Sequence, residues 1–211
     1  MSRLFSAWAL GLSAFMTAAG ALGQGAPAAT VRPPGIYLRA AVLGSSMNPE
    51  GLTYRAERGS ESAAPGSFTG KQLGFGRVLL PGFSVGVHVD GHWFHLGVGA
   101  DLYARPDVTL LNDAQVGAGA VAWVRGGPRV VVGPVALLAA LRLGAHLQQV
   151  ERRAGTEVVT YDSAAGVYAL DLGVAWRPIP WVQLDAIVGY DLGTLSAVTA
   201  SVAVNVGWSR R

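Results

Sequence analysis

The chain has no cysteine among its 211 residues. It therefore carries no disulfide framework, no thiolate nucleophile and no cysteine-based zinc site. Charge is also scarce, because Asp, Glu, Lys and Arg together make 14% of the chain, against roughly 25% in soluble domains. The formal net charge is +3, but the arginines are scattered singly and form no basic stripe of the kind that nucleic acid requires. We expect no nucleic-acid partner.

Hydrophobic residues and glycine are what the chain has in excess. They account for 51% of the chain and for 29 residues respectively, and glycine is thus about twice its usual share of ~7%. After Gly166, a large apolar residue alternates with a small or polar one along 167–176, 182–192 and 198–208. Successive side chains of a strand point to opposite faces, so each run predicts a strand with one apolar face.

The same alternation precedes these three runs, and it is weaker only along 116–125. It covers residues 35–44, 83–90, 93–104, 116–125 and about 131–148. Short turns are predicted at Asp90-Gly91, Gly126 to Arg129 and Arg177 to Pro180. Loops are predicted at 45–71, 105–115 and 149–165, where no period emerges. Residues 72–81 either extend the following strand or form a separate hairpin arm.

The composition of the two faces of these strands indicates a membrane barrel. The face opposite the apolar one carries mostly Gly, Ala and Ser with single charged residues, which suits a narrow interior better than a surface in water. Short connections alternate with longer ones, as in outer-membrane barrels, and most runs supply the roughly 9–11 residues that a spanning strand needs. Unpaired edges cannot exist in hydrocarbon, so the sheet must close. The prediction is an all-β fold, an eight-stranded antiparallel up-and-down transmembrane β-barrel.

The N-terminal residues predict a cleavable signal peptide over 1–23. Arg3 gives a positive start, Leu4 to Ala21 is an apolar core, and Ala21-Leu22-Gly23 is a small-x-small cleavage site. A permanent membrane helix is the alternative interpretation. Residues 24–34 then form a flexible lead-in, and residues 35–211 form the barrel.

The short turn Trp176-Arg177-Pro178-Ile179-Pro180-Trp181 and the final run Val198 to Trp208 resemble those of eight-stranded outer-membrane barrels of the OmpA and OmpX type. The resemblance implies the outer membrane of a Gram-negative bacterium, reached by secretion to the periplasm. It implies contacts with outer-membrane lipid and lipopolysaccharide, and recognition of Trp208 by the barrel-assembly machinery. Ser209-Arg210-Arg211 follow that aromatic residue, which departs from the family pattern.

Two sets of residues are the candidate site residues. A lumen network of arginine and carboxylate is expected because buried charges are costly unless paired, and it comprises Arg39, Asp101, Arg142, Asp171 and Asp185. An aromatic girdle is expected where strands leave the bilayer, and it comprises Tyr168, Trp176, Trp181, Tyr190 and Trp208. Gly97 and Gly99 are expected to admit large neighbours into the lumen.

No cofactor or metal site is expected. His92 and His95 are three residues apart, which places them on opposite faces of a strand, and we see no carboxylate or thiol that completes a histidine set. A lipid A deacylase would need a lipid-facing His-x-Ser pair, which the chain lacks. A lipid A acyltransferase would have to use Asp162, Ser163 and His146.

The sequence therefore predicts a small non-enzymatic outer-membrane barrel whose lumen is filled by side chains. Its role is structural, or lies in surface contacts made by the outward loops, above all 45–71, with an extracellular partner that the sequence does not identify. A lipid A-modifying enzyme, a narrow ion or proton pore and a soluble lipocalin-like barrel are the alternatives.

Overall fold

The computed structural model describes residues 35–56, 67–106, 110–111, 114–154 and 157–209. The expected signal peptide, 1–23, and the lead-in, 24–34, lie outside these residues, as does part of the first long loop. No helix within the described ranges is long and apolar enough to cross a bilayer.

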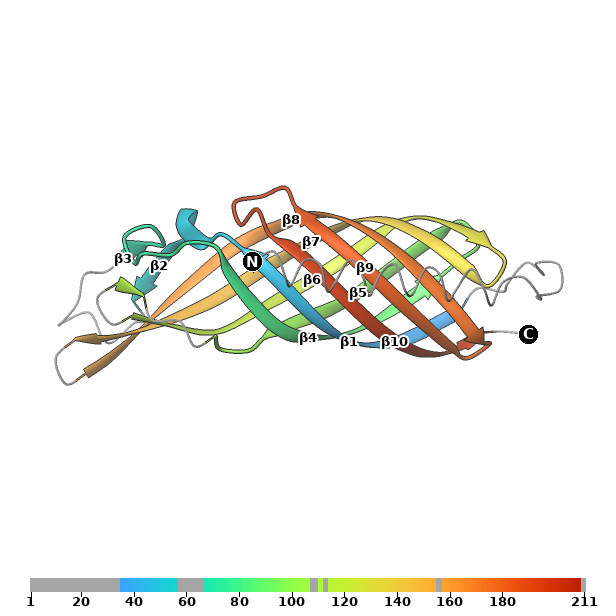
Figure 1. Ribbon diagram of the computed structural model, residues 1–211, viewed down its shortest axis with the longest axis horizontal. Helices are drawn as coiled ribbons and strands as arrows, with labels where there is room; N and C mark the ends of the chain where they lie inside the picture. Colours follow the sequence, from blue (N-terminus) through green and yellow to red (C-terminus); the bar gives the residue numbers. More distant parts are fainter. Residues whose placement is uncertain (1–34, 57–66, 107–109, 112–113, 155–156, 210–211) are drawn as a thin grey trace, which may run out of the picture.

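Ten strands and one short 3-10 helix form the described chain. In order they are β1 (Gly35–Met47), η1 (Pro49–Gly51), β2 (Thr53–Ala56), β3 (Ser67–Thr69), β4 (Val78–Asp90), β5 (Phe94–Tyr103), β6 (Ala114–Val132), β7 (Val135–Ala154), β8 (Glu157–Ile179), β9 (Val182–Asp191) and β10 (Val198–Ser209). Strands β1 and β4 to β10 each pair antiparallel with the next, and β10 returns to β1 (Figure 1). The predicted closed eight-stranded up-and-down barrel is confirmed.

The register of the ladder sets the barrel's shape. One path of paired residues runs through Ile36, Val89, Leu96, Gly126, Leu141, Leu170, Tyr190, Val198 and Ser46. It returns to β1 ten residues beyond its start, from position 36 to position 46. With strands ~4.8 Å apart and a rise of ~3.3 Å per residue, this stagger tilts the strands by about 40°, as the slanted ribbons of Figure 1 show.

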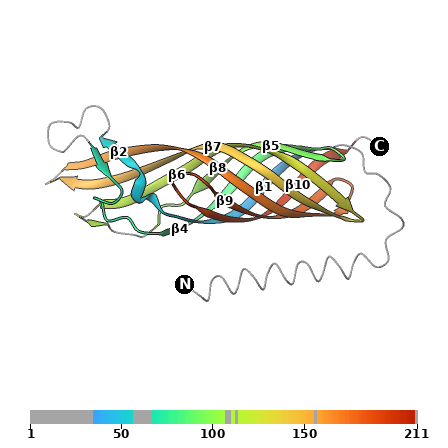
Figure 2. The same cartoon turned by 90° about the horizontal axis from the view of Figure 1, so that it is seen from above.

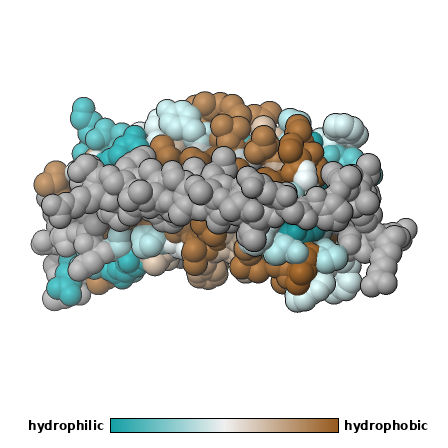
Figure 3. All heavy atoms as spheres, turned by 45° about the vertical axis from the view of Figure 1, so that its right-hand side comes forward, coloured by the Kyte–Doolittle hydropathy of each residue, from teal (hydrophilic) through white to brown (hydrophobic). Residues whose placement is uncertain are grey.

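The predicted orientation of the side chains, with the apolar ones outward and the alternate ones inward, is also confirmed. On β1, Ile36, Leu38 and Val42 are exposed, whereas Tyr37 and Arg39 are buried. The other barrel strands follow the same pattern, so hydrophobic side chains form a belt around the middle of the molecule and hydrophilic ones gather at its ends (Figure 3). This belt is the surface that meets hydrocarbon.

The predicted inner turn at Gly126 to Arg129 was wrong, because these residues lie inside β6 and the chain turns at Gly133-Pro134. The Gly-Gly-Pro sequence is typical of a turn, but Gly127 serves another purpose. A Cβ atom there would lie 2.0 Å from the carbonyl oxygen of Ala139 on β7, so only glycine allows the two strands to approach this closely. We call the end with the turns at 91–93, Gly133-Pro134 and Pro180-Trp181 the inner end.

The predicted loop at 149–165 was also wrong, because β7 and β8 continue as a paired hairpin up to Ala154 and Glu157. Along this hairpin the inward face is apolar and the outward face is polar, which is the reverse of the pattern in the rest of the barrel. Val150, Val159 and Tyr161 point inward and are buried, whereas the outward positions carry Gln149, Glu151, Arg153 and Asp162. The hairpin has therefore left the hydrocarbon and follows the rule of a soluble sheet.

The first long outer segment is more ordered than predicted. Within 45–71, η1, β2 and β3 are formed, and β2 pairs with β8 through Arg55↔Asp162 and Ala56↔Tyr161. In Figure 2 this hairpin lies at the outer end beside the tips of β7 and β8. Residues 78–81 extend the following strand, as one of the two alternatives for 72–81 required, whereas 72–77 lie outside it.

A matched pair of substitutions tests where the bilayer lies. Leu141 is halfway along the ladder path, and Val158 lies on the outer hairpin, yet both side chains are 59% exposed. We expect Leu141→Arg to lower the free energy of unfolding by about 2–4 kcal/mol in lipid vesicles, and Val158→Arg to change it by less than ~1 kcal/mol. Urea unfolding followed by tryptophan fluorescence measures both, and equal effects would contradict the assigned membrane position.

Candidate functional site

The interior of the barrel is filled by two different kinds of side chain. Its outer part is apolar and forms one continuous core that includes Leu43, Tyr103, Trp123, Val150 and Tyr161. Its inner part is polar, and its charged members are Arg39, Asp90, Asp101, Arg125, Arg129, Arg142, Asp171, Arg177 and Asp185, all buried. The polar filling is therefore confined to the inner part of the lumen.

All five predicted lumen charges lie inside the barrel, in two groups. Arg39 Nη1 lies 3.2 Å from Asp185 Oδ2. Arg142 bridges two carboxylates, with its Nη1 3.1 Å from Asp101 Oδ2 and its Nε 3.3 Å from Asp171 Oδ1. Each charge thus has an opposite charge at contact distance, which a low-dielectric interior demands.

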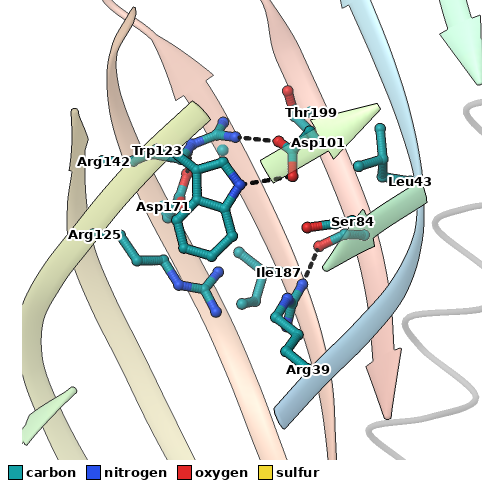
Figure 4. A pocket seen from close by; sticks show the side chains of 12 residues that line it. Arg39, Leu43, Ser84, Asp101, Trp123, Arg125, Arg142, Asp171, Ile187 and Thr199 are labelled. Carbon is teal, nitrogen blue, oxygen red and sulfur yellow. Dashed lines mark hydrogen bonds and ion pairs between the residues drawn. The ribbon is translucent and has the colours of Figure 1, made fainter. Parts of the chain in front are cut away.

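Neutral neighbours hold the Arg142 group in place. The indole Nε1 of Trp123 donates a hydrogen bond of 2.8 Å to Asp101 Oδ1 (Figure 4). Gly189 leaves room for the pair, because a Cβ there would lie 2.3 Å from Asp171 Oδ1. Gly99 does the same for Trp123, whose Cζ2 would lie 2.6 Å from such an atom. This confirms the expectation that Gly99 admits a large neighbour.

A polar cluster lies at the inner end, and its carboxylate and arginine members were not predicted from the sequence. It joins His88, Asp90, His95, Arg125, Arg129 and Arg177. Because an arginine Nε is always protonated, the 3.1 Å contact makes His95 Nε2 the acceptor of Arg125, so His95 carries its proton on Nδ1 and donates to Asp90 Oδ1 at 2.7 Å. Arg129 and Arg177 lie 3.6 and 3.9 Å from Asp90 Oδ2.

The expectation that no carboxylate completes a histidine set was wrong. His88, Asp90 and His95 offer three ligand atoms within 4.8 Å of one another, because the inward positions of β4 and β5 face each other across the first turn. Both ring nitrogens of His95 are nevertheless engaged, and three guanidinium groups contact the cluster. A divalent cation would be repelled by them, so we interpret the cluster as hydrogen bonds and ion pairs that close the inner end.

The outer end is closed by a cap, which we define as η1, β2, β3, the segment 70–77 and the outer parts of β7 and β8. Tyr54 of β2 stacks on Phe75 with ring centroids 5.4 Å apart, and Phe68 packs edge-on against Tyr161 at 5.3 Å. Burial raises the pKa of the Tyr54 hydroxyl, which keeps it neutral inside the cap. Because β2 pairs with β8 beyond the end of β9, it also covers part of an edge that would otherwise be open.

The predicted girdle residues lie on the outer face of the barrel at two heights. Trp181 and Trp208 are exposed at the inner end, where Gly207 N donates a hydrogen bond to Trp181 O. Trp176, which lies on β8 shortly before the turn to β9, is half-buried. Tyr190 is exposed near the outer end of β9, and Tyr168 is exposed midway along β8. Trp93, which was not in the predicted set, is exposed at the first inner turn.

The residues of a hypothetical acyltransferase do not meet. Ser163 and His146 point inward and are buried, whereas Asp162 is exposed on the opposite face of β8. Ser-His-Asp chemistry requires the three groups within hydrogen-bond reach of one another. The structure gives that alternative no geometric support.

A closed eight-stranded barrel with an apolar outer belt and a filled lumen is the fold of the eight-stranded outer-membrane β-barrels. The solved structures that this chain resembles include Neisserial surface protein A (NspA), at a TM-score of 0.54 and 14% identity over 82% of this chain and 97% of that one. They also include Ail, the attachment invasion locus protein of Yersinia pestis, at a TM-score of 0.50 and 12% identity over 83% of this chain and 97% of that one. At such identities the likeness establishes the fold alone. No protein-family model and no curated protein matches the sequence.

Removing Arg142 tests whether the lumen ion pairs carry stability. We expect Arg142→Met to lower the free energy of unfolding by about 3–5 kcal/mol, because Asp101 and Asp171 would stay buried without their cation. Arg105 is the matched control, since it pairs with Glu151 at 3.1 Å while both side chains remain largely exposed. Arg105→Gln should cost less than ~1 kcal/mol. Denaturant titration in detergent micelles compares the two, and similar losses would contradict the assigned role.

Proposed function

We propose that this chain is a non-enzymatic outer-membrane protein whose barrel is sealed and whose cap makes contacts outside the cell. The observation that carries the proposal is the continuous apolar core that joins the outer lumen to the cap, from Leu43 and Trp123 up to Tyr54 and Tyr161. Such a core requires an ordered outer segment, which a simple membrane anchor does not need.

The filled lumen argues against a pore. The cavity between Arg39, Trp123 and Asp171 has a volume of ≈ 20 Å³, which is space for about one water molecule. Apolar side chains lie outward of this cavity, and the cluster around Asp90 lies inward of it. A hydrated ion therefore has no continuous aqueous path through the described interior.

The outward face of the cap supports a role in surface contacts. Arg153 and Asp162 are exposed there, and Arg105 pairs with Glu151 near the surface. Mixed charge above an apolar belt suits contact with outer-membrane lipid and lipopolysaccharide, which we propose as neighbours of the barrel. We further propose that the assembly machinery reads Trp208 on β10. The partner outside the cell is left open.

Cysteine labelling tests the location and orientation of the barrel, and the absence of native cysteine makes single substitutions clean. Val158→Cys lies on the cap, and His92→Cys lies on an exposed inner turn. We expect a membrane-impermeant maleimide to label only the first variant on intact cells, and both after the outer membrane is opened. Heat-modifiable migration of both variants serves as the folding control. Labelling of the His92→Cys variant alone on intact cells would reverse the assignment.

Two measurements separate this proposal from the alternatives. Purified protein in planar bilayers should show no stepwise conductance, because the lumen is filled at both ends. Overexpression should leave the lipid A mass spectrum unchanged, and Ser163→Ala should behave like the unaltered chain. Steady open-channel currents would support the pore, whereas a new lipid A mass lost in Ser163→Ala would support the enzyme.

A further inference from the structure

One edge of β8 has no partner strand over a short stretch. The pairing with β9 ends at Ala169↔Asp191, and the pairing with β2 begins at Arg55↔Asp162. Between them, residues 163–167 pair with β7 on one side only. Figure 1 shows β8 continuing toward the outer end past the loop that follows β9.

The backbone groups of Ala164 and Gly166 point to this unpaired side. Tyr168 marks the direction, because its N–H donates to Asp191 Oδ1 and its carbonyl oxygen accepts from Leu192 N, both just past the β9 ladder. Residues two apart on a strand direct their backbone groups to the same side. Within the described part of the chain, no hydrogen bond reaches the N–H or C=O of Ala164 or Gly166 on that side.

These backbone groups are accessible from outside the barrel. Ala164 and Gly166 are both exposed, and the exposed surface of Gly166 belongs to its backbone because glycine has no side chain. The carbonyl oxygen of Gly166 is directed at Gly193, where an added Cβ atom would lie 3.5 Å from it. Glycine at position 193 therefore leaves that oxygen uncovered, and the edge offers two N–H and two C=O groups.

The unpaired stretch lies where the outward side chains change from apolar to polar. Opposite Ala164, Leu147 of β7 is 56% exposed, and Leu192, just past β9, is 61% exposed. One pair further out, the outward residues are Gln149 and Asp162. The edge is therefore at the outer boundary of the hydrocarbon, where a lipid joins its acyl chains to its headgroup. Backbone groups without partners are costly at this depth.

We propose that this edge binds the linkage region of an outer-leaflet saccharolipid, the lipid A part of lipopolysaccharide. The edge offers both donors and acceptors, so a ligand must supply both kinds of group. The linkage region of lipid A does so, because amide N–H and hydroxyl groups lie there beside carbonyl oxygens. A glycerophospholipid presents only ester and phosphate oxygens at this depth. A peptide strand finds only Ala164 and Gly166 free, which is fewer residues than strands usually pair.

A cation lies on the polar side of the same edge. Arg55 is exposed on β2 opposite Asp162, yet it takes part in none of the ion pairs of the described residues. Its guanidinium is therefore free to bind a phosphate group. Apolar, hydrogen-bonding and cationic groups thus follow one another in the order of acyl chain, linkage and phosphate in lipid A. The assignment rests on the proposed function, which makes lipopolysaccharide a neighbour of the barrel.

Amide resonances provide the direct test, because they report on the N–H groups themselves. The folded barrel is titrated with lipid A in dodecylphosphocholine micelles, which offer no amide, hydroxyl or ester group. The amides of Ala164 and Gly166 should shift to saturation, whereas those of Ala165 and Val167, which face β7, should not move. Phosphatidylmethanol, which is anionic but has no donor, should need on the order of tenfold more lipid for half-saturation.

Two substitutions test the contacts on either side of the linkage region. Gly166→Pro removes one free donor at a position where an edge tolerates proline, and it should raise the lipid A fraction at half-saturation about fivefold, read at Ala164. Arg55→Gln should raise it by about the same factor and serves if Gly166→Pro does not fold. Arg153→Gln is the matched control, since Arg153 is exposed further out on the same hairpin, and it should leave the titration unchanged.

Three outcomes would overturn the site. Equal half-saturation by lipid A and phosphatidylmethanol would show that the edge does not select donors. Resonances of Ala164 and Gly166 that respond to neither lipid would mean that water alone covers the edge. A titration that Gly166→Pro and Arg55→Gln leave intact would place the lipid elsewhere. Each result would leave the proposed function standing, because the cysteine labelling tests location and orientation separately.

Discussion

The rest of this structure depends on one constraint: hydrocarbon offers no partner to a backbone N–H or C=O group. The chain meets it by closing the ladder, so that β10 pairs with β1 along its length. Closure with eight strands and a ten-residue stagger fixes a narrow cylinder. Everything inside must then fit the remaining space, which explains why an inward glycine such as Gly99 lies beside a large side chain such as Trp123.

In such a narrow interior, buried ion pairs are part of the packing that fills the barrel. Arginine presents several donors in a fixed plane, so Arg142 on β7 can hold Asp101 on β5 and Asp171 on β8 at once. Toward the outer end the filling becomes apolar, and there the chain builds the core that supports the cap. The barrel thus joins a polar inner part to an outer part that is packed like a soluble domain.

Alternation along the sequence predicted the barrel well, whereas features that depend on where the bilayer ends were predicted poorly. The eight strands, the outward direction of their apolar side chains and the inward position of the five lumen charges were predictable. Every second residue of a strand points inward, so the positions of inward residues can be counted along the sequence. Residues 149–165 were assigned wrongly because, beyond the bilayer, the inward positions are apolar and the outward positions are polar, which is the opposite of the pattern within the bilayer. Gly126 to Arg129 were assigned wrongly because local turn signals do not reveal that Gly127 meets a neighbouring backbone. The pairing of His95 with Asp90 and Arg125 was not predictable, since it depends on register between strands rather than on spacing along one strand.

The pairing of β2 with β8 brings together two segments more than a hundred positions apart in the chain, around residues 55 and 162. The surface they share exists only when the barrel is closed and the cap is seated on it. An antibody raised against the native protein at this place would recognise a conformational epitope, and peptides copied from either segment would not compete for it. Sequence change in one segment alone would be enough to remove that epitope while the barrel beneath it remains intact.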